Sequence, residues 1–310
     1  MSARTPAAAP ARTPLAGAGY ALGAFGLWGA FPLYFKAVAS VPATEVLGHR
    51  VVWSVAWVAV LLTVLRQWPA VRAVARDWRT LGMLAVSALL ISCNWLIFIW
   101  AVAHDHVLQA SLGYFITPLV SVLLGRIVLS ESLSRQQWAA VGVAGAGVLW
   151  MLVGVGSVPW ISLGLAATFG SYGLARKVIA VGSVPGLFIE TALLAPLALG
   201  YLVVLGVEGT GRFGSGDVGF DLLLAAAGLV TAAPLILFAQ AARRLRLASV
   251  GLFQYLTPTC QMLLAVLLFG EPFTSGQVIT FACIWVALAL YSTSAWRRRG
   301  GRRPAPVRDA

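Results

Sequence analysis

A few ionisable side chains interrupt long apolar runs of this sequence, and they are the residues best placed to do chemistry. Glu190 is the clearest case, because Phe188 and Ile189 precede it and further apolar residues follow it. A carboxyl group in such surroundings can carry a proton or bind a cationic group. An ion pair with Arg176 or Lys177 would make Glu190 structural instead, and the sequence leaves both interpretations open.

A second group of ionisable residues opens another apolar run. Glu45, His49 and Trp53 follow one another at intervals of four residues, which places them on one helix face. Arg50 stands beside them, so a carboxylate, an imidazole and a guanidinium are expected to meet near one membrane surface. This group could act as a gate or as a proton-sensitive pair. The alternative is a cluster that anchors the helix end among lipid headgroups.

Two further segments each carry a polar stripe. In both, hydrogen-bonding side chains recur at i, i+3 and i+7 with a proline at i+4, which is the spacing of one helix face. Each proline frees a carbonyl group and is predicted to bend its helix. We expect the stripes to line a substrate path, although hydrogen bonds between helices would also explain them. They consist of Tyr114, Thr117, Pro118 and Ser121, and of Gln254, Thr257, Pro258 and Gln261.

Amide and aromatic side chains in other runs suit an organic ligand, since a ring face can also bind a cation. They complete the predicted substrate path, and any one of them could instead be an ordinary packing residue. These residues are Trp28, Asn94, Trp95, Tyr172 and Tyr255.

Motifs of several other functions are missing from the sequence. It contains no P-loop, no HExxH and no GxSxG motif, so nucleotide hydrolysis and the common hydrolytic mechanisms are not indicated. Cys93, Cys260 and Cys283 show no CxxC spacing and no neighbouring histidine cluster. Neither a metal site nor a cofactor is therefore expected.

The elements that must position these residues are membrane-spanning helices. Hydrophobic residues make up 60% of the 310 residues, charged residues make up only 10%, and the mean hydropathy is +0.87. A spanning helix needs roughly 20 apolar residues. The predicted fold class is an all-α membrane protein of about ten transmembrane helices, at residues 16–36, 46–65, 81–103, 107–129, 136–154, 157–175, 185–206, 221–241, 247–269 and 275–296.

The distribution of charge predicts an orientation. Counted through the loops between the ten stretches, 18 of the 22 basic residues fall on one side of the membrane, whereas the opposite side receives mainly acidic residues. Because basic loops remain in the cytoplasm, both termini are expected there. The arginines near the carboxyl terminus are expected to contact anionic lipid headgroups rather than nucleic acid.

The second half of the chain repeats residues of the first half in the same order. Ala248, Ser249 and Gly251 match Ala110, Ser111 and Gly113, and further along Thr257 and Pro258 match Thr117 and Pro118. Shared apolar composition would explain matched leucines but not these ordered polar matches. Since five helices make one unit, the second unit must enter the bilayer in the opposite sense, which predicts an inverted repeat and alternating access. The predicted organisation is a disordered cytoplasmic arm at 1–15, five-helix units at 16–154 and 155–296, and a basic cytoplasmic tail at 297–310.

Four motifs carry a resemblance to a known family. They read EVLGHR at 45–50, NWLIFIW at 94–100, SLGYFITP at 111–118 and GLFQYLTP at 251–258. The sequence resembles the RarD group of the EamA family, in the drug/metabolite transporter superfamily, over about residues 15–298. The resemblance implies a bacterial plasma-membrane carrier with a central cavity between its halves, and its group name is tied to chloramphenicol sensitivity. The arm rich in Ala and Pro and the arginine-rich tail depart from the family pattern.

The favoured function is the transport of a small organic metabolite or drug across the bacterial inner membrane, driven by a proton gradient or by exchange. The alternatives are an integral-membrane enzyme, which would use His49, His104, His106 or Glu190, and a helical bundle that moves no solute. Pairs of small residues four positions apart, such as Gly19 with Gly23, would also allow two copies to form a homodimer.

Overall fold

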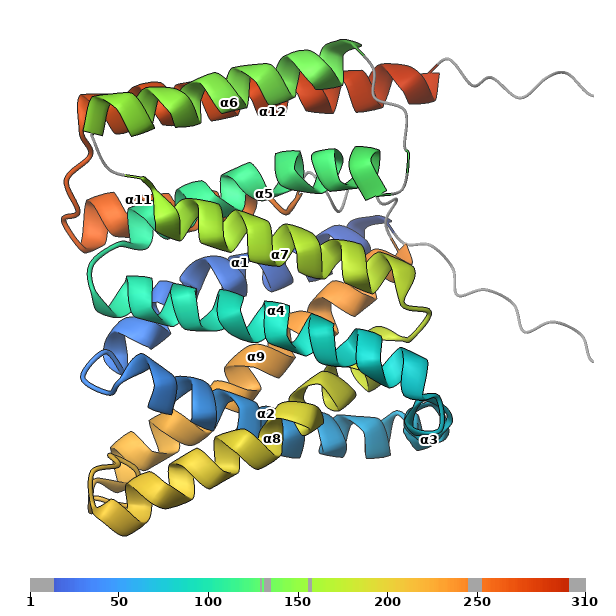
Figure 1. The fold of residues 1–310 in the computed structure, drawn as a ribbon, viewed down its shortest axis with the longest axis vertical. Coiled ribbons are helices and arrows are strands. Elements are labelled where there is room, and N and C mark those ends of the chain that lie inside the picture. Colours follow the sequence, from blue (N-terminus) through green and yellow to red (C-terminus); the bar gives the residue numbers. More distant parts are fainter. Residues whose placement is uncertain (1–13, 129, 131–134, 156–157, 245–252, 301–310) are drawn as a thin grey trace, which may run out of the picture.

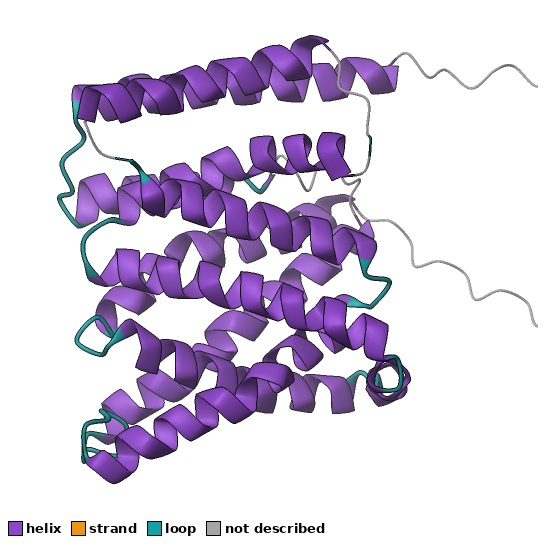
Figure 2. Cartoon of the chain, in the orientation of Figure 1, coloured by secondary structure: helices purple, strands orange, loops and turns teal. Residues whose placement is uncertain are grey.

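The computed structural model describes residues 14–128, 130, 135–155, 158–244 and 253–300. Within these ranges the chain is helical and contains no strand (Figure 2). Helices are expected of such apolar runs, because a helix satisfies its backbone hydrogen bonds internally where no water is available. The predicted arm and tail lie largely outside the described residues, although α1 already begins at Pro14 and α12 continues to Gly300.

Figure 1 shows how the helices are arranged. Loops of a few residues join most of them, so neighbours in the sequence run roughly antiparallel. In the first half of the chain they are α1 (Pro14–Ala37), α2 (Ala43–Val64), α3 (Trp68–Ala75), α4 (Trp78–Ala103), α5 (Val107–Val128) and α6 (Arg135–Val155). In the second half they are α7 (Trp160–Val178), α8 (Ser183–Glu208), α9 (Val218–Arg244), α11 (Leu256–Leu263), the π-helix η1 (Leu264–Leu268) and α12 (Ser275–Gly300).

Five helical stretches in the described part of the chain are long and apolar enough to cross a membrane. They are α2, α4, α5, α8 and the stretch Val218–Leu235 of α9. The total of about ten spans stays a prediction. The short helix α3 was not predicted, and with eight residues it is too short to span a bilayer.

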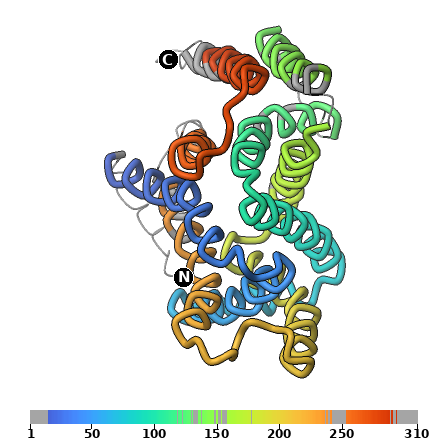
Figure 3. Tube along the Cα trace, turned by 90° about the vertical axis from the view of Figure 1, so that its left-hand side faces the viewer, coloured from blue at the N-terminus to red at the C-terminus, as the bar shows by residue number. Residues whose placement is uncertain are grey.

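Helices that are distant in the sequence pack side by side. α5 packs on α7 and α1 packs on α11, while α4 packs on both α7 and α8, and α9 packs on both α1 and α2. The remaining extensive contacts join α2 to α8, α5 to α11, and α6 to α12. Figures 1 and 3 show the α6–α12 pair at one edge of the bundle.

These contacts pair off between the two halves. Each long helix of the first half has a counterpart in the second half. The counterparts of α1, α2, α4, α5 and α6 are, in this order, α7, α8, α9, α11 and α12. When counterparts are exchanged, the α5–α7 contact becomes the α11–α1 contact, α4–α7 becomes α9–α1, and α4–α8 becomes α9–α2. The contacts α2–α8, α5–α11 and α6–α12 each join a helix to its own counterpart, so the exchange leaves them unchanged.

Glycines allow close helix approaches in both halves of the chain. A Cβ atom added to Gly29 of α1 would lie 2.6 Å from the Cβ of Cys260 in α11. A Cβ atom added to Gly170 of α7 would lie 2.9 Å from Cγ1 of Val120 in α5. When the two halves of the sequence are matched, Gly29 corresponds to Gly170 and Val120 corresponds to Cys260. The two contacts therefore occupy equivalent places in the repeat.

Polar contacts tie the loops together at the end of the bundle where α1, α4, α8 and η1 finish. Lys36 forms an ion pair with Asp105. Glu271 lies in the loop before α12, and its carboxylate accepts hydrogen bonds from the backbone N–H groups of Val107 (2.7 Å) and Leu108 (2.9 Å). It thereby caps the first turn of α5. Burial raises the pKa of Glu271 above its ordinary value, although the two N–H donors oppose this effect.

The predicted proline bends have different outcomes. Pro258 lies in the first turn of α11, where a missing N–H group disturbs no helical hydrogen bond, so it does not bend the middle of a helix. The irregularity of this segment is instead η1, the five-residue π-helix that follows α11. Pro118 lies within α5, which continues as one helix through it. The side chain of Pro118 is outside the described part of the chain.

Candidate functional site

The most deeply buried cation of the described residues is Arg50 in α2. It lies seven residues after the first residue of the helix, about 10 Å along the helix axis, and its exposed fraction is 3%. Its guanidinium carbon lies 4.1 Å from the ring centroid of Trp95. The ring centroids of Phe35 and Phe31 follow at 5.4 and 5.6 Å. Arg50 is thus surrounded by aromatic rings that can stabilise its charge.

This placement corrects the expectation that Arg50 meets Glu45 and His49. Residues 45 and 49 are about one helical turn apart and share a face, whereas residue 50 points about 100° further around the helix axis. His49 Nε2 lies 3.9 Å from a carboxylate oxygen of Glu45. Among the described residues, no carboxylate forms an ion pair with Arg50.

Polar groups of other helices lie beside the aromatic rings around Arg50. The Tyr114 hydroxyl donates a hydrogen bond to Oδ1 of Asn94 (3.1 Å), and Asn94 Nδ2 donates to the backbone oxygen of Leu165 in α7 (3.1 Å). The Tyr34 hydroxyl donates to the backbone oxygen of Leu223 in α9 (2.8 Å). Both tyrosines lie close enough to interact electrostatically with Arg50. We call this set the Arg50 cluster: Phe31, Tyr34, Phe35, Arg50, Asn94, Trp95 and Tyr114.

A second polar cluster surrounds Glu190, seven residues after the first residue of α8. Glu190 is fully buried, and its carboxylate accepts hydrogen bonds from the hydroxyls of Ser87 (2.6 Å) and Tyr172 (3.4 Å). Arg176 Nη1 lies 3.5 Å from the same carboxylate. Of the two ion pairs proposed for Glu190, the structure contains the one with Arg176, and the Lys177 side chain is outside the described part of the chain. The Glu190 cluster thus joins α4, α7 and α8.

The predicted gate residues Glu45 and His49 lie beneath the loop between α8 and α9. Glu45 accepts a hydrogen bond from the backbone N–H of Arg212 (2.7 Å), and the ring centroid of Phe213 lies 4.9 Å from that of His49. Both ring nitrogens of His49 are buried without a hydrogen-bond partner. A loop of the second half therefore covers the start of α2 in the first half.

The other predicted path residues are not gathered at either cluster. Thr257 and Gln261 donate to the backbone oxygens of Phe25 and Trp28 in α1, so both hold α11 against α1. The Trp28 ring packs against Phe25 and Phe238. Thr117 donates within its own helix to Gly113, and Ser121 is exposed. Gln254 and Tyr255 are partly buried at the start of the α11 segment.

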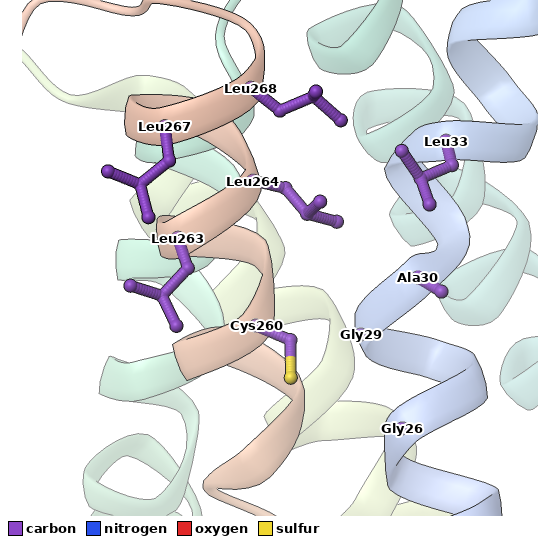
Figure 4. Close-up of a pocket in the computed structure, with 9 residues that line it drawn as sticks. All are labelled: Gly26, Gly29, Ala30, Leu33, Cys260, Leu263, Leu264, Leu267 and Leu268. Atoms are coloured by element: carbon purple, nitrogen blue, oxygen red, sulfur yellow. The ribbon is translucent and has the colours of Figure 1, made fainter.

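An apolar groove lies on the α1–α11 contact, away from both clusters. Gly26, Gly29, Ala30 and Leu33 line one side, and Figure 4 shows them facing the α11–η1 segment. Apart from the thiol of Cys260, its side chains are hydrocarbon. Such a surface suits a lipid chain better than a polar solute. The other lining residues are Leu263, Leu264, Leu267 and Leu268.

Several residues of the two clusters do not stand out in the sequence. Phe31, Phe35 and Tyr34 look like ordinary core residues of an apolar run, and only the fold places them around Arg50. Ser87 could have been found as a polar residue within the third predicted span. No group of three or more His, Cys, Asp or Glu side chains that could hold a metal ion occurs in the described ranges.

The chain is similar in sequence to a family of transporters and in fold to a protein of known structure. The model of the EamA-like transporter family matches residues 15–153. Protein RarD of Escherichia coli strain K12 is 49% identical over 275 residues, which cover 89% of this chain and 93% of that protein. The chloramphenicol-sensitive protein RarD of Pseudomonas aeruginosa is 34% identical, over 88% of this chain and 92% of that protein. A chain of known crystal structure shares the fold with a TM-score of 0.58 at 19% identity, over 91% of this chain and 98% of its own length.

Proposed function

The chain belongs to the EamA-like transporter family, and from this premise we propose that it is a secondary transporter of a small organic metabolite or drug in the bacterial plasma membrane. As a member of this family it is a multi-pass membrane protein. The observation that carries the proposal is the position of its buried polar groups. Arg50 and Glu190 each lie seven residues into their helices, which enter the bundle from opposite ends.

Both clusters involve helices of the two halves. Asn94 and Tyr34 connect the Arg50 cluster to α7 and α9, and Ser87 of α4 donates to Glu190 of α8. Ionisable groups in a membrane interior are energetically costly, so those that occur there are usually paired and often mark a substrate path. Two such groups on opposite sides of the centre suit a carrier that exposes its site to each side in turn.

We further propose that the halves are inverted repeats that alternate in access. The exchange of helix contacts between the halves supports this arrangement. So do the equivalent close approaches at Gly29 and Gly170. The predicted units at 16–154 and 155–296 divide the chain at the end of α6, so that α1 to α6 fall in the first unit and α7 to α12 in the second.

We place the termini in the cytoplasm. The helix ends at Pro14 and Gly300 lie at the same end of the bundle (Figure 1). That end also holds Arg66, Arg72, Arg76 and Arg79, whereas the opposite end holds Asp105, Glu208, Asp217, Asp221 and Glu271. The positive-inside rule then puts the basic end in the cytoplasm.

The test is transport in proteoliposomes that contain the purified full-length protein. Radiolabelled amino acids, aromatic metabolites, organic cations, organic acids and chloramphenicol are each measured in exchange for the same unlabelled solute. We expect saturable exchange of at least one class, and its loss in Asn94→Leu, which removes the bonds from α4 to α5 and α7. Thr293→Ala, at an exposed position of α12, serves as the control. Exchange no faster than in protein-free liposomes for every class would refute the proposal.

A further inference from the structure

The buried charged side chains of this bundle differ in whether they have polar or ionic partners. The carboxylate of Glu190 has Arg176 at 3.5 Å and two hydroxyl donors. The carboxylate of Glu45 accepts the backbone N–H of Arg212. The guanidinium of Arg50 has no carboxylate partner among the described residues, and its Nε is buried without a hydrogen-bond partner. An unmatched positive charge therefore remains at the Arg50 cluster.

A purely structural role explains this arrangement poorly. Removing a charge from water is costly, and the attraction of aromatic rings returns only part of that cost. A methionine at this position could fill the space between Phe31, Phe35 and Trp95 without that cost. The charge at position 50 thus needs an explanation that lies outside the folded chain itself.

The planar shape of the guanidinium group indicates that a carboxylate ligand could bind to it. An arginine side chain stacks its flat face on aromatic rings and directs its N–H groups outward in the plane, in a fork that fits a carboxylate. Trp95, with its centroid 4.1 Å from the guanidinium carbon, provides such a stacking ring. The stacking fixes the direction of the fork, and the unpartnered Nε shows that at least part of its edge is unused.

We propose that the Arg50 cluster binds the carboxylate group of the transported substrate, so that the substrates of this protein are organic acids with an apolar body. This inference rests on the proposed transport function and adds a substrate class to it. The carboxylate pairs with the N–H edge of Arg50, whose Nε has no hydrogen-bond partner among the described residues. The rings of Phe31, Phe35 and Trp95 then contact the apolar body of the acid.

The test compares acids with their own amides, which have nearly the same shape but no charge. Binding of butyrate, 3-phenylpropionate and indole-3-acetate, and of the three corresponding amides, is measured by thermal shift on the detergent-solubilised full-length protein. We expect at least one acid to bind more than about tenfold more tightly than its amide, because the amide cannot form the charge-assisted hydrogen bonds to Arg50. If every acid and its amide bind equally, or if none of the six binds, the proposal is wrong.

Three variants locate the binding group. In Arg50→Met the preference for the acid should disappear, and in Arg50→Lys, which keeps the charge but lacks the fork, it should be weakened. Arg79→Met is the matched control, because Arg79 also lies over a tryptophan ring, 5.6 Å from the centroid of Trp78, but at an exposed position. Unchanged acid binding in Arg50→Met would overturn the assignment.

The transport assay separates the failure of this inference from the failure of the proposed function. If the proteoliposomes exchange only cationic or neutral solutes, and the acids do not compete, the protein is a transporter but the assignment of Arg50 is wrong. If an acid binds through Arg50 but no solute is exchanged, the site exists and the proposed transport function is wrong.

Discussion

Arg50 and Glu190 occupy comparable places, each seven residues into a helix, yet different kinds of groups surround their charges. Glu190 has a basic partner and two hydroxyl donors, and Arg50 has aromatic rings. The two residues are therefore expected to respond in opposite ways to the removal of their charge. Charge removal relieves a desolvation penalty at Arg50, whereas at Glu190 it removes the ionic partner of Arg176.

Arg50→Met should stabilise the protein. The substitution removes a buried charge that has no ionic partner in the described chain, and it leaves a side chain that can pack against Trp95. Replacing buried charges by apolar groups is often stabilising, by about 1 kcal/mol or more. The melting temperature in detergent without ligand measures this effect. A lower melting temperature would mean that the stacked guanidinium supports the fold.

Glu190→Gln should abolish the stimulation of transport by a pH gradient while transport itself persists. A glutamine can keep a hydrogen bond to Ser87 but carries no proton. Uptake is measured in proteoliposomes with and without an imposed gradient, and Glu208→Gln, at the exposed end of the same helix, is the control. If Glu190 serves only as the structural partner of Arg176, Glu190→Gln should leave the stimulation unchanged.

At the scale of elements, small residues and caps decide how closely the helices approach one another. Gly29 and Gly170 hold the α1–α11 and α5–α7 pairs at distances that no larger residue would permit. Ser111 adds a hydrogen bond of 2.7 Å to the backbone oxygen of Pro258, between α5 and α11. These contacts depend on the tertiary structure, and the hydrophobic pattern alone does not specify them.

Gly29→Ala should destabilise the protein by about 1–3 kcal/mol, because the added methyl group would overlap Cys260 and push α1 away from α11. Gly26→Ala is the matched control, since a Cβ atom there meets nothing within 4 Å. Combining Gly29→Ala with Cys260→Gly removes the opposing Cβ and should restore much of the loss. Melting temperatures of the natural protein, the two single variants and the double variant form a double-mutant cycle. A cycle without coupling would contradict the contact.

The cap of α5 by Glu271 predicts a pH dependence of stability. Burial raises the pKa of Glu271 above the ordinary value of 4.5, so the folded state binds this proton more tightly than the unfolded state does. The resulting stabilisation is present at acidic pH and is lost as the pH rises through the raised pKa. The melting temperature of the natural protein minus that of Glu271→Gln should therefore fall as the pH rises from acidic to neutral. A difference that rises over this range would show that the N–H donors outweigh burial.

At the scale of the whole molecule, the two halves are joined at the end of the bundle that we place outside the cell. Glu271 of the second half caps α5 of the first, and the loop between α8 and α9 covers Glu45 and His49 in α2. The opposite end carries most of the arginines of the described loops. The proposed orientation follows from this asymmetry of charge.

Cysteine labelling tests this orientation. In a background without the three natural cysteines, Ser215→Cys lies in the exposed loop between α8 and α9, and Ser183→Cys lies at the exposed start of α8. We expect a membrane-impermeant maleimide to label residue 215 on intact spheroplasts and residue 183 only on inverted vesicles. The reverse pattern would place the termini outside the cell.

The sequence predicted the kind of fold more fully than the site. Long apolar runs indicate helices reliably. Asn94, Trp95 and Tyr114 were expected on a substrate path; the fold places them in the Arg50 cluster, and their contact with a solute stays a prediction. The sequence could not show that Trp95 stacks on Arg50, since that contact joins α4 to α2. Nor could it separate Thr257, which holds α11 against α1, from a residue that faces a solute.

The connectors of the two halves differ, and the difference has an energetic consequence. The connector between α2 and α4 contains the helix α3, which packs on α4 and α8. Its counterpart between α8 and α9 is an irregular loop held by the carboxylates of Glu45 and Asp221. In the alternating-access mechanism that we propose, identical halves would populate the inward-open and outward-open conformations equally. Unequal connectors would favour one conformation, and each difference of about 1.4 kcal/mol would shift the ratio about tenfold. The resting direction of the proposed carrier would then be set outside the substrate site, in its loops.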